Sequence, residues 1–203
     1  KFESAVTGII AESTDSWQVV AGSPLNEMSE DAEVGLVNHE KGLYLAFTAE
    51  RVTAQARNEY ARKMVADNED SFASQGRLVK FPNQVKVTIG GEQINCNRYR
   101  VDAGGAYEYL MTVCFVKDYA FQIVGWGLQS DGVGFVADIS EGLGQIEFMN
   151  SRELESLRYE MRDLADRENA VGSDWTYVTE YSKILALDSP GQNLVGFGGC
   201  RSE

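Results

Sequence analysis

Residues 92–128 restrict the fold of this chain more than any other part of the sequence. An extended run over 92–101 is followed by the turn sequence Asp-Ala-Gly-Gly and by a longer extended run over 106–128. In the returning run, the odd-numbered positions from 107 to 115 and the even-numbered positions from 110 to 116 are both largely apolar. A sheet with one wet face would alternate apolar and polar residues, so this pattern predicts a β-meander covered on both faces.

Further strands are predicted on both sides of this meander. Alternating or short apolar runs bounded by turn residues indicate them. They cover residues 8–11 and 16–21, a hairpin of 32–37 and 42–48 closed by the turn 38–41, and residues 77–90 with Pro82 at a bulge or edge. The segment 23–28 is interpreted as a turn of helix or a loop.

Two helices are predicted within the first 150 residues. From residue 53 the apolar side chains recur at helical spacing, which predicts an amphipathic helix ending at Gly76. After Ser130 and Asp131, apolar residues at intervals of three and four continue to Met149, which predicts a second helix. The order of elements predicts an α+β fold: an antiparallel β-sheet flanked by helices on both faces, an α/β/α sandwich, with a C-terminal helical extension.

The residues after this sandwich are predicted to be a separate unit, so the chain is divided into a domain of residues 1–150 and an extension of 151–203. The capping-box sequence Asn-Ser-Arg-Glu at 150–153 precedes apolar residues at helical spacing, which predicts a helix to about Asn169. This helix is predicted to pack either on the core of its own chain or on another chain. If the other chain is a second copy, a homodimer forms through residues 151–169. Residues 171–187 have strand-forming character, and their Asp-Trp start allows a second repeat to begin there.

Several of these segments together resemble a known family. They are the strand with Trp17, the hairpin strand Leu43–Phe47, the long amphipathic helix, the aromatic strand Tyr107–Phe115, the strand Ala120–Val124 and a closing helix. Over roughly residues 5–149 this order is similar to the Mog/PsbP-like α/β/α sandwich family, whose relatives include PsbP, Mog, DcrB-type envelope proteins and type VI adaptor chaperones. The resemblance implies an accessory, chaperone or regulatory role, and it transfers no site residue because fold alone does not define function.

The composition limits the partners. The formal net charge is −13, which disfavours nucleic acid and anionic membrane surfaces and favours a basic partner if the partner is charged. No apolar run approaches the ~18 residues needed to span a bilayer, so no direct membrane span is expected. A periplasmic, secreted or envelope-associated location is favoured over the cytoplasm, as the resemblance implies.

The three cysteines are Cys96, Cys114 and Cys200, and none of them has metal-binding CxxC spacing. If the meander hairpin closes through a three-residue loop, Cys96 and Cys114 lie opposite each other on neighbouring strands. Two readings stay open at this point. The pair forms a cross-strand disulfide, or both cysteines are buried as reduced thiols.

The sequence offers little catalytic equipment. The single histidine, His39, lies in a predicted hairpin turn, and no GxSxG, HExxH or P-loop motif is present. Acidic clusters around residues 27–33 and 67–70 lack the spacing of an EF-hand and are interpreted as solvated charge. We therefore assign no catalytic, cofactor-binding or metal-binding residue and expect no cofactor.

The leading functional hypothesis is a non-enzymatic protein-interaction module, an accessory subunit or chaperone-like adaptor of an envelope or secreted assembly. Two alternatives remain: a hydrolase whose carboxylates meet only in the fold, and a carrier of a small apolar ligand between sheet and helix. Large aromatic side chains dominate binding energetics. The candidate interaction surface is therefore drawn from the aromatics of the meander and tail: Tyr99, Tyr107, Tyr109, Trp126, Trp175 and Tyr177.

Overall fold

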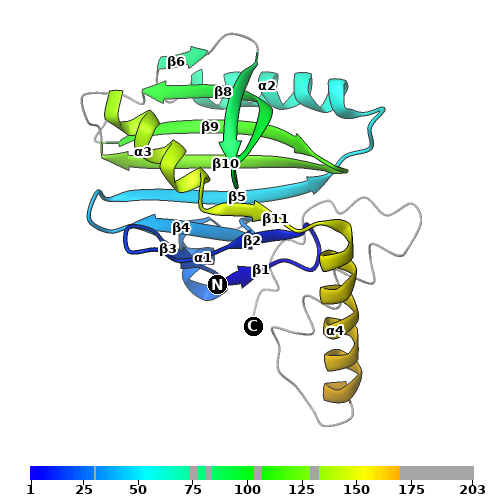
Figure 1. The fold of residues 1–203 in the computed structure, drawn as a ribbon. Coiled ribbons are helices and arrows are strands. Elements are labelled where there is room, and N and C mark those ends of the chain that lie inside the picture. The colour runs from blue at the N-terminus through cyan, green and yellow to red at the C-terminus, as the bar shows by residue number, and fades with distance from the viewer. Residues whose placement is uncertain (30, 74–76, 81–83, 103–106, 129–132, 170–203) are drawn as a thin grey trace, which may run out of the picture.

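The computed structural model of the chain describes residues 1–29, 31–73, 77–80, 84–102, 107–128 and 133–169 (Figure 1). Strands and helices alternate along the chain as the sequence predicts. In chain order they are β1 (Phe2–Glu3), β2 (Ile9–Ala11), β3 (Gln18–Val20), α1 (Ser23–Met28), β4 (Val34–Asn38), β5 (Leu43–Arg51), α2 (Arg57–Ala73), β6 (Arg77–Lys80), β7 (Val85–Ile89), β8 (Glu92–Asp102), β9 (Tyr107–Val116), β10 (Tyr119–Leu128), α3 (Val133–Leu143), β11 (Ile146–Phe148) and α4 (Ser151–Asn169).

The described strands form two antiparallel sheets. The larger sheet has eight strands in the order β3-β4-β5-β10-β9-β8-β6, with β7 also paired to β8, and the smaller sheet has the order β1-β2-β11. The predicted meander is the centre of the large sheet, where β8, β9 and β10 pair in sequence. The predicted α+β class with an antiparallel sheet is confirmed.

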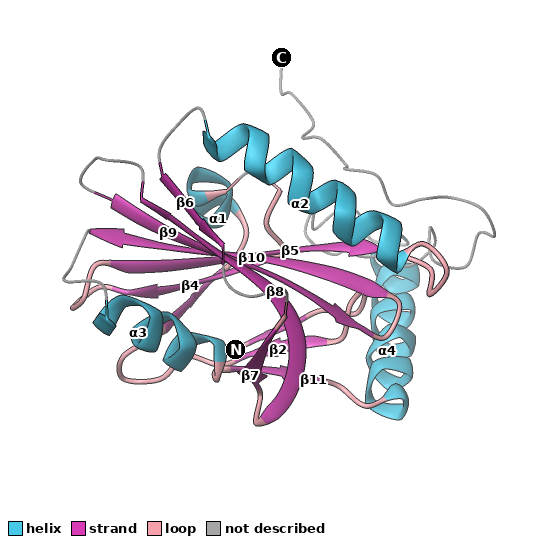
Figure 2. Cartoon of the chain, turned by 90° about the horizontal axis from the view of Figure 1, so that it is seen from above, coloured by secondary structure: helices cyan, strands magenta, loops and turns pink. Residues whose placement is uncertain are grey.

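Both faces of the large sheet are covered. Figure 2 shows α2 on one side of the strands and α3 on the other. On the α3 side, Leu110 and Cys114 belong to the main core together with Ile139 of the helix. On the α2 side, Met111 and Val113 belong to a second, smaller cluster. The two apolar sets of β9 are therefore explained by two separate cores, as predicted.

Helix α3 can approach the sheet closely because glycines lie at the contact. An added Cβ at Gly142 would lie 2.5 Å from Leu45 Cδ1 and 2.8 Å from Trp17 Cζ2. On the sheet side of the same interface, an added Cβ at Gly125 would lie 2.9 Å from Ile139 Cδ1. The missing side chains leave the space that Trp17 and Ile139, both fully buried, occupy.

The predicted end of the second helix is wrong. Helix α3 stops at Leu143, and Ile146, which the sequence placed in the helix, pairs with Ala11 of β2 instead. The amide of Gly144 donates to the carbonyl groups of Ser140 and Glu141, which closes the last turn. Glycine favours helix termination. The following residues then gain ladder hydrogen bonds on β2.

The predicted strand over 77–90 is two strands on one edge of β8. Lys80 pairs with Tyr99, whereas Val85 pairs with Cys96, so the partner residue on β8 moves by three positions while the chain advances by five. The register of pairing with β8 therefore shifts by two residues between β6 and β7. Pro82, which the sequence placed at a bulge or edge, lies outside the described residues.

Helix α4 begins with the predicted capping box and packs on the first residues of its own chain. Asn150 Oδ1 accepts hydrogen bonds from the amides of Arg152 and Glu153, both at 3.0 Å, and Glu153 Oε2 accepts one from the amide of Asn150 at 2.8 Å. Buried Leu154 lies beside Gly8. Arg158 donates to the carbonyl groups of Ala5 and Val6. Beyond these contacts the helix extends away from both sheets (Figure 1).

The domain boundary at residue 150 remains a prediction. The suggested second repeat also remains a prediction, because it falls on residues outside the described ranges. Within the described part of the chain, no helix has the length and apolar character needed to cross a membrane.

A disulfide joins the first two strands of the meander. Cys96 of β8 and Cys114 of β9 are direct register partners with Cα atoms 4.4 Å apart, and their sulfur atoms are bonded. This resolves the two readings left open by the sequence in favour of the bridge. Both cysteines are buried on the α3 side of the sheet.

We predict that Gly142→Ala lowers the free energy of unfolding by about 1 to 3 kcal/mol because its methyl group overpacks against Trp17 and Leu45. The control is Gly134→Ala on the same helix, where an added Cβ meets only Asp138 Oδ2 at 4.0 Å. That variant is expected to gain up to about 1 kcal/mol from helix propensity. Urea unfolding measures both, and equal shifts in the two variants would contradict the close packing.

Reduction of the disulfide is expected to lower the free energy of unfolding by about 3 kcal/mol, because the bridge closes a loop of sequence separation 18 in the unfolded chain. The measurement is urea unfolding with and without dithiothreitol in a Cys200→Ser background, which removes the third cysteine. An unfolding midpoint that does not respond to the reductant would show that the bridge does not stabilise the fold.

Candidate binding surfaces

Three of the predicted aromatic residues gather at one end of the large sheet. Trp126 of β10 is in register with Tyr44 of β5 and with Tyr109 of β9, and the Tyr44 and Trp126 rings stack with centroids 5.5 Å apart at 13°. Two positions further along the ladder, on the same face of the sheet, Tyr107 pairs with Leu128, and their exposed fractions are 44% and 57%. We call these five residues the aromatic surface. Large apolar groups exposed side by side are typical of binding surfaces.

Of the other three predicted residues, the structure describes only Tyr99, which is not part of this surface. Tyr99 is only 3% exposed and packs with Met111 and Val113 in the smaller core. The prediction of an exposed Tyr99 is therefore corrected, because strand alternation gives the face of a residue but not how far a helix or neighbouring strand covers that face. Trp175 and Tyr177 lie outside the described residues.

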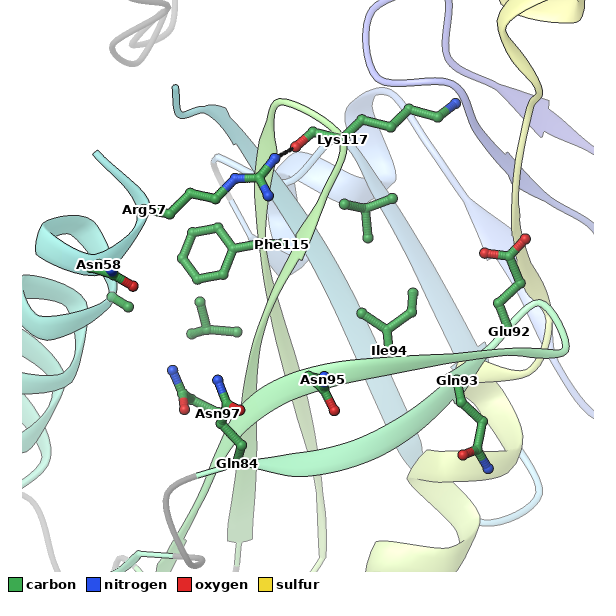
Figure 3. Close-up of a pocket in the computed structure, with 13 residues that line it drawn as sticks. Arg57, Asn58, Gln84, Glu92, Gln93, Ile94, Asn95, Asn97, Phe115 and Lys117 are labelled. Carbon is green, nitrogen blue, oxygen red and sulfur yellow. Dashed lines mark hydrogen bonds between the residues drawn. The ribbon is translucent and has the colours of Figure 1, made fainter. Parts of the chain in front are cut away.

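A second feature is concave and was not found from the sequence. A cavity of about 520 Å³ lies between the start of α2, the β7–β8 ribbon and the end of β9 (Figure 3). We call it the amide groove because side-chain amides dominate its polar lining. Its lining residues are Arg57, Asn58, Ala61, Gln84, Glu92, Gln93, Ile94, Asn95, Asn97, Val113, Phe115, Val116 and Lys117.

The groove exists because two paired strands separate. The ladder between β8 and β9 ends at the disulfide pair Cys96 and Cys114, although β8 begins at Glu92 and β9 continues to Val116. Beyond the bridge, β8 stays with β7 and leaves β9. The disulfide therefore marks the closed end of the opening.

The tip of the β7–β8 ribbon rests on the small sheet. Gly90 and Gly91 both have positive φ, 56° and 79°, which fits the two-residue turns that close hairpins. An added Cβ at Gly90 would lie 2.4 Å from the carbonyl oxygen of Ile146. This close contact with β11 holds the ribbon away from β9.

Helix α2 forms the opposite wall, and Tyr60 anchors it to the sheet. The Tyr60 ring meets Phe115 edge-on, with centroids 6.0 Å apart. Its hydroxyl donates to Glu50 Oε2 at 2.7 Å and accepts from Gln122 Nε2 at 3.2 Å. Burial first, and then the hydrogen bond to Glu50, raise the pKa of Tyr60 well above its usual value, so the phenol stays protonated.

Two of the charged side chains that line the groove, Arg57 and Lys117, donate hydrogen bonds to backbone carbonyl groups. Arg57 donates through Nη2 to the carbonyl oxygen of Lys117, while Arg57 Nε is buried and has no partner among the described residues. The ammonium group of Lys117 donates to the carbonyl oxygen of Met149 at 2.6 Å, away from the groove. Among the described lining residues Glu92 is the one acid. A pair of facing carboxylates, which the hydrolase alternative requires, is not formed by this lining.

The sequence did contain a signal for part of the groove. Gln93, Asn95 and Asn97 alternate with Ile94 and Cys96, which is typical of a strand with one amide face. The contributions of Arg57, Asn58 and Phe115 come from other elements, so their convergence required the fold. The groove lies between sheet and helix, as the carrier alternative requires, but its lining is mainly polar.

A partly buried ion pair lies in the sheet outside the groove. Arg100 of β8 pairs with Glu108 of β9, whose side chain is 1% exposed. Beside it, Arg98 donates to Thr112 Oγ1, and burial lowers the pKa of the Arg98 guanidinium. His39 is exposed, and no group of three or more His, Cys, Asp or Glu residues within the described ranges is placed to hold a metal ion.

Comparisons with known proteins return similar structures alone. No family model and no curated protein matches the chain. The chain is similar to the solution structure of cyanobacterial PsbP (CyanoP) from Synechocystis sp. PCC 6803, with a TM-score of 0.48 and 11% identity over 73% of this chain and 91% of that one. It is also similar to LpqN of Mycobacterium tuberculosis, described as involved in cell envelope biogenesis, with a TM-score of 0.46 and 9% identity over 70% and 83%.

A third similar structure comes from Bacteroides thetaiotaomicron, with a TM-score of 0.45 and 10% identity over 91% of this chain and 69% of that one. One of these structures is a PsbP protein, and PsbP is also among the relatives that the sequence resembles.

We predict that Gly90→Ala destabilises the chain more than Gly91→Ala does. Both substitutions place alanine at positive φ, at a cost of roughly 1 to 2 kcal/mol. An added Cβ at Gly91 has no atom within 4 Å, whereas the one at Gly90 meets the β11 backbone and adds about 1 kcal/mol or more. Urea unfolding measures the difference, and amide chemical shifts of β11 and β8 are expected to move only in the Gly90 variant. Equal losses would show that the ribbon tip is not held on β11.

Proposed function

We propose that this protein is a non-enzymatic protein-interaction module, an accessory subunit or chaperone-like adaptor, that contacts its partner through the aromatic surface. The observation that carries the proposal is the exposed register pair Tyr107 and Leu128 beside the stacked rings of Tyr44 and Trp126. Rigid aromatic side chains bury large areas at low entropic cost. Such clusters supply much of the binding energy at protein interfaces.

The compartment we propose is an envelope, periplasmic or extracellular one. The Cys96–Cys114 disulfide supports this location, because disulfides persist in oxidising compartments and are rare in the cytosol. The net charge of −13 supports a protein partner with a basic contact face over nucleic acid or an anionic lipid surface.

Association of two copies through residues 151–169 stays a prediction. Helix α4 has its first turns packed on its own chain through Leu154 and Arg158, while Tyr159 is 77% exposed. The later turns are the part of the helix that a second copy would have to contact.

The proposal is tested by replacing Leu128 with a photo-reactive phenylalanine derivative in the host that makes the protein. We expect a cross-linked protein product of defined mass that is weakened at least several-fold by Tyr107→Ala, because hot-spot truncation costs about 2 kcal/mol or more. Tyr159, an exposed aromatic residue on α4, is the matched control position for the cross-linker.

Each outcome of this experiment decides a point. A product from position 128 that is absent from position 159 supports the aromatic surface. A product of twice the chain mass from position 159 supports the homodimer through α4. Products from position 159 with none from position 128 contradict the proposal.

A further inference from the structure

We propose that the amide groove binds an extended polypeptide segment, which adds as a strand to the free edge of β8. This site is separate from the aromatic surface and does not depend on it. The groove volume of about 520 Å³ lies within the range of binding pockets. The class of ligand is inferred from the backbone geometry of the groove and from its amide side chains.

The free edge follows from the strand registers. At Cys96, β8 pairs with Val85 of β7 on one edge and with Cys114 of β9 on the other. From Glu92 to Asn95 the β7 pairing continues, whereas the β9 pairing has ended. Among the described strands, this part of β8 therefore has one edge without a strand partner. Edges of this kind pair with added strands through main-chain hydrogen bonds.

The lining matches the chemistry of a peptide backbone. Each Asn or Gln side chain both donates and accepts hydrogen bonds, as a peptide group does. Gln93, Asn95 and Asn97 supply amides from β8, Asn58 supplies one from α2 across the groove, and Gln84 supplies one from beside β7. A bound strand would thus meet hydrogen-bonding groups on both sides.

Other ligand classes fit these observations less well. A helical segment has its backbone groups bonded internally, so it leaves the edge of β8 unpaired. A small apolar ligand would leave the five side-chain amides of the lining without partners. The floor of Phe115 and Val113 gives an extended segment an apolar contact for every second side chain.

The first experiment selects binders from a displayed library of random linear heptapeptides on the intact chain. The strongest binder is then studied by amide hydrogen exchange and by single N-methylation of each of its peptide bonds. Strand addition predicts new protection at alternate amides of Glu92–Asn95. It also predicts that N-methylation at every second peptide position weakens binding at least tenfold while the positions between tolerate it, because only alternate amides face the partner strand.

Variants of the chain test the side-chain contacts with the same peptide by calorimetry. Asn95→Ala is expected to weaken binding roughly threefold to tenfold, as the loss of a hydrogen bond does. Gln18→Ala is the matched control, since Gln18 is an exposed amide residue on β3 outside the groove. It should leave the affinity unchanged.

The proposal is overturned by any of several results. A library that yields no binder protecting β8 would contradict it, as would a binder whose N-methyl scan has no period of two. Equal affinity for the Asn95→Ala variant and the unsubstituted chain would show that the amide side chains of β8 do not contact the ligand. Cross-linking at position 128 reports on the aromatic surface alone, so its result does not alter this conclusion.

Discussion

The covalent link between β8 and β9 is the constraint on which the functional geometry depends. Cys96 and Cys114 hold the two strands together at their last paired position, and beyond it the strands separate. Fixing this position matters because the strands on either side of it take part in different structures. Toward one end they form the centre of the sheet, and toward the other they form two sides of the amide groove.

The separation of the strands is supported by packing on both sides. The turn at Gly90 rests on the backbone of β11, so the small sheet holds the β7–β8 ribbon in place. Tyr60 holds α2 against Phe115 and Gln122 of the large sheet. These contacts join segments that lie far apart in the sequence, and together they place amides from a helix and a ribbon around one opening.

The two candidate surfaces differ in how far the sequence predicted them. The aromatic surface was predicted in part, because Tyr107, Tyr109 and Trp126 stand out in the meander by residue type alone. Tyr99 has the same residue type but packs against Met111 and Val113, and nothing in its neighbourhood along the chain distinguishes it. Tyr44 and Leu128 were missed because their proximity to Trp126 and Tyr107 depends on strand register.

Local periodicity determined the classes of element and the two-sided burial of the central sheet, because alternation and helical spacing are properties of neighbouring residues. The local sequence also determined the capping box of α4, because the donor and the acceptor are three residues apart. The tertiary structure decided the end of α3, where β11 gains hydrogen bonds from distant β2, and the bonding of Cys96 to Cys114. It also decided where β8 leaves β9. The ribbon that leaves β9 carries Gly90 against Ile146 of β11, which lies 56 residues further along the chain. No local pattern in the sequence encodes such a contact.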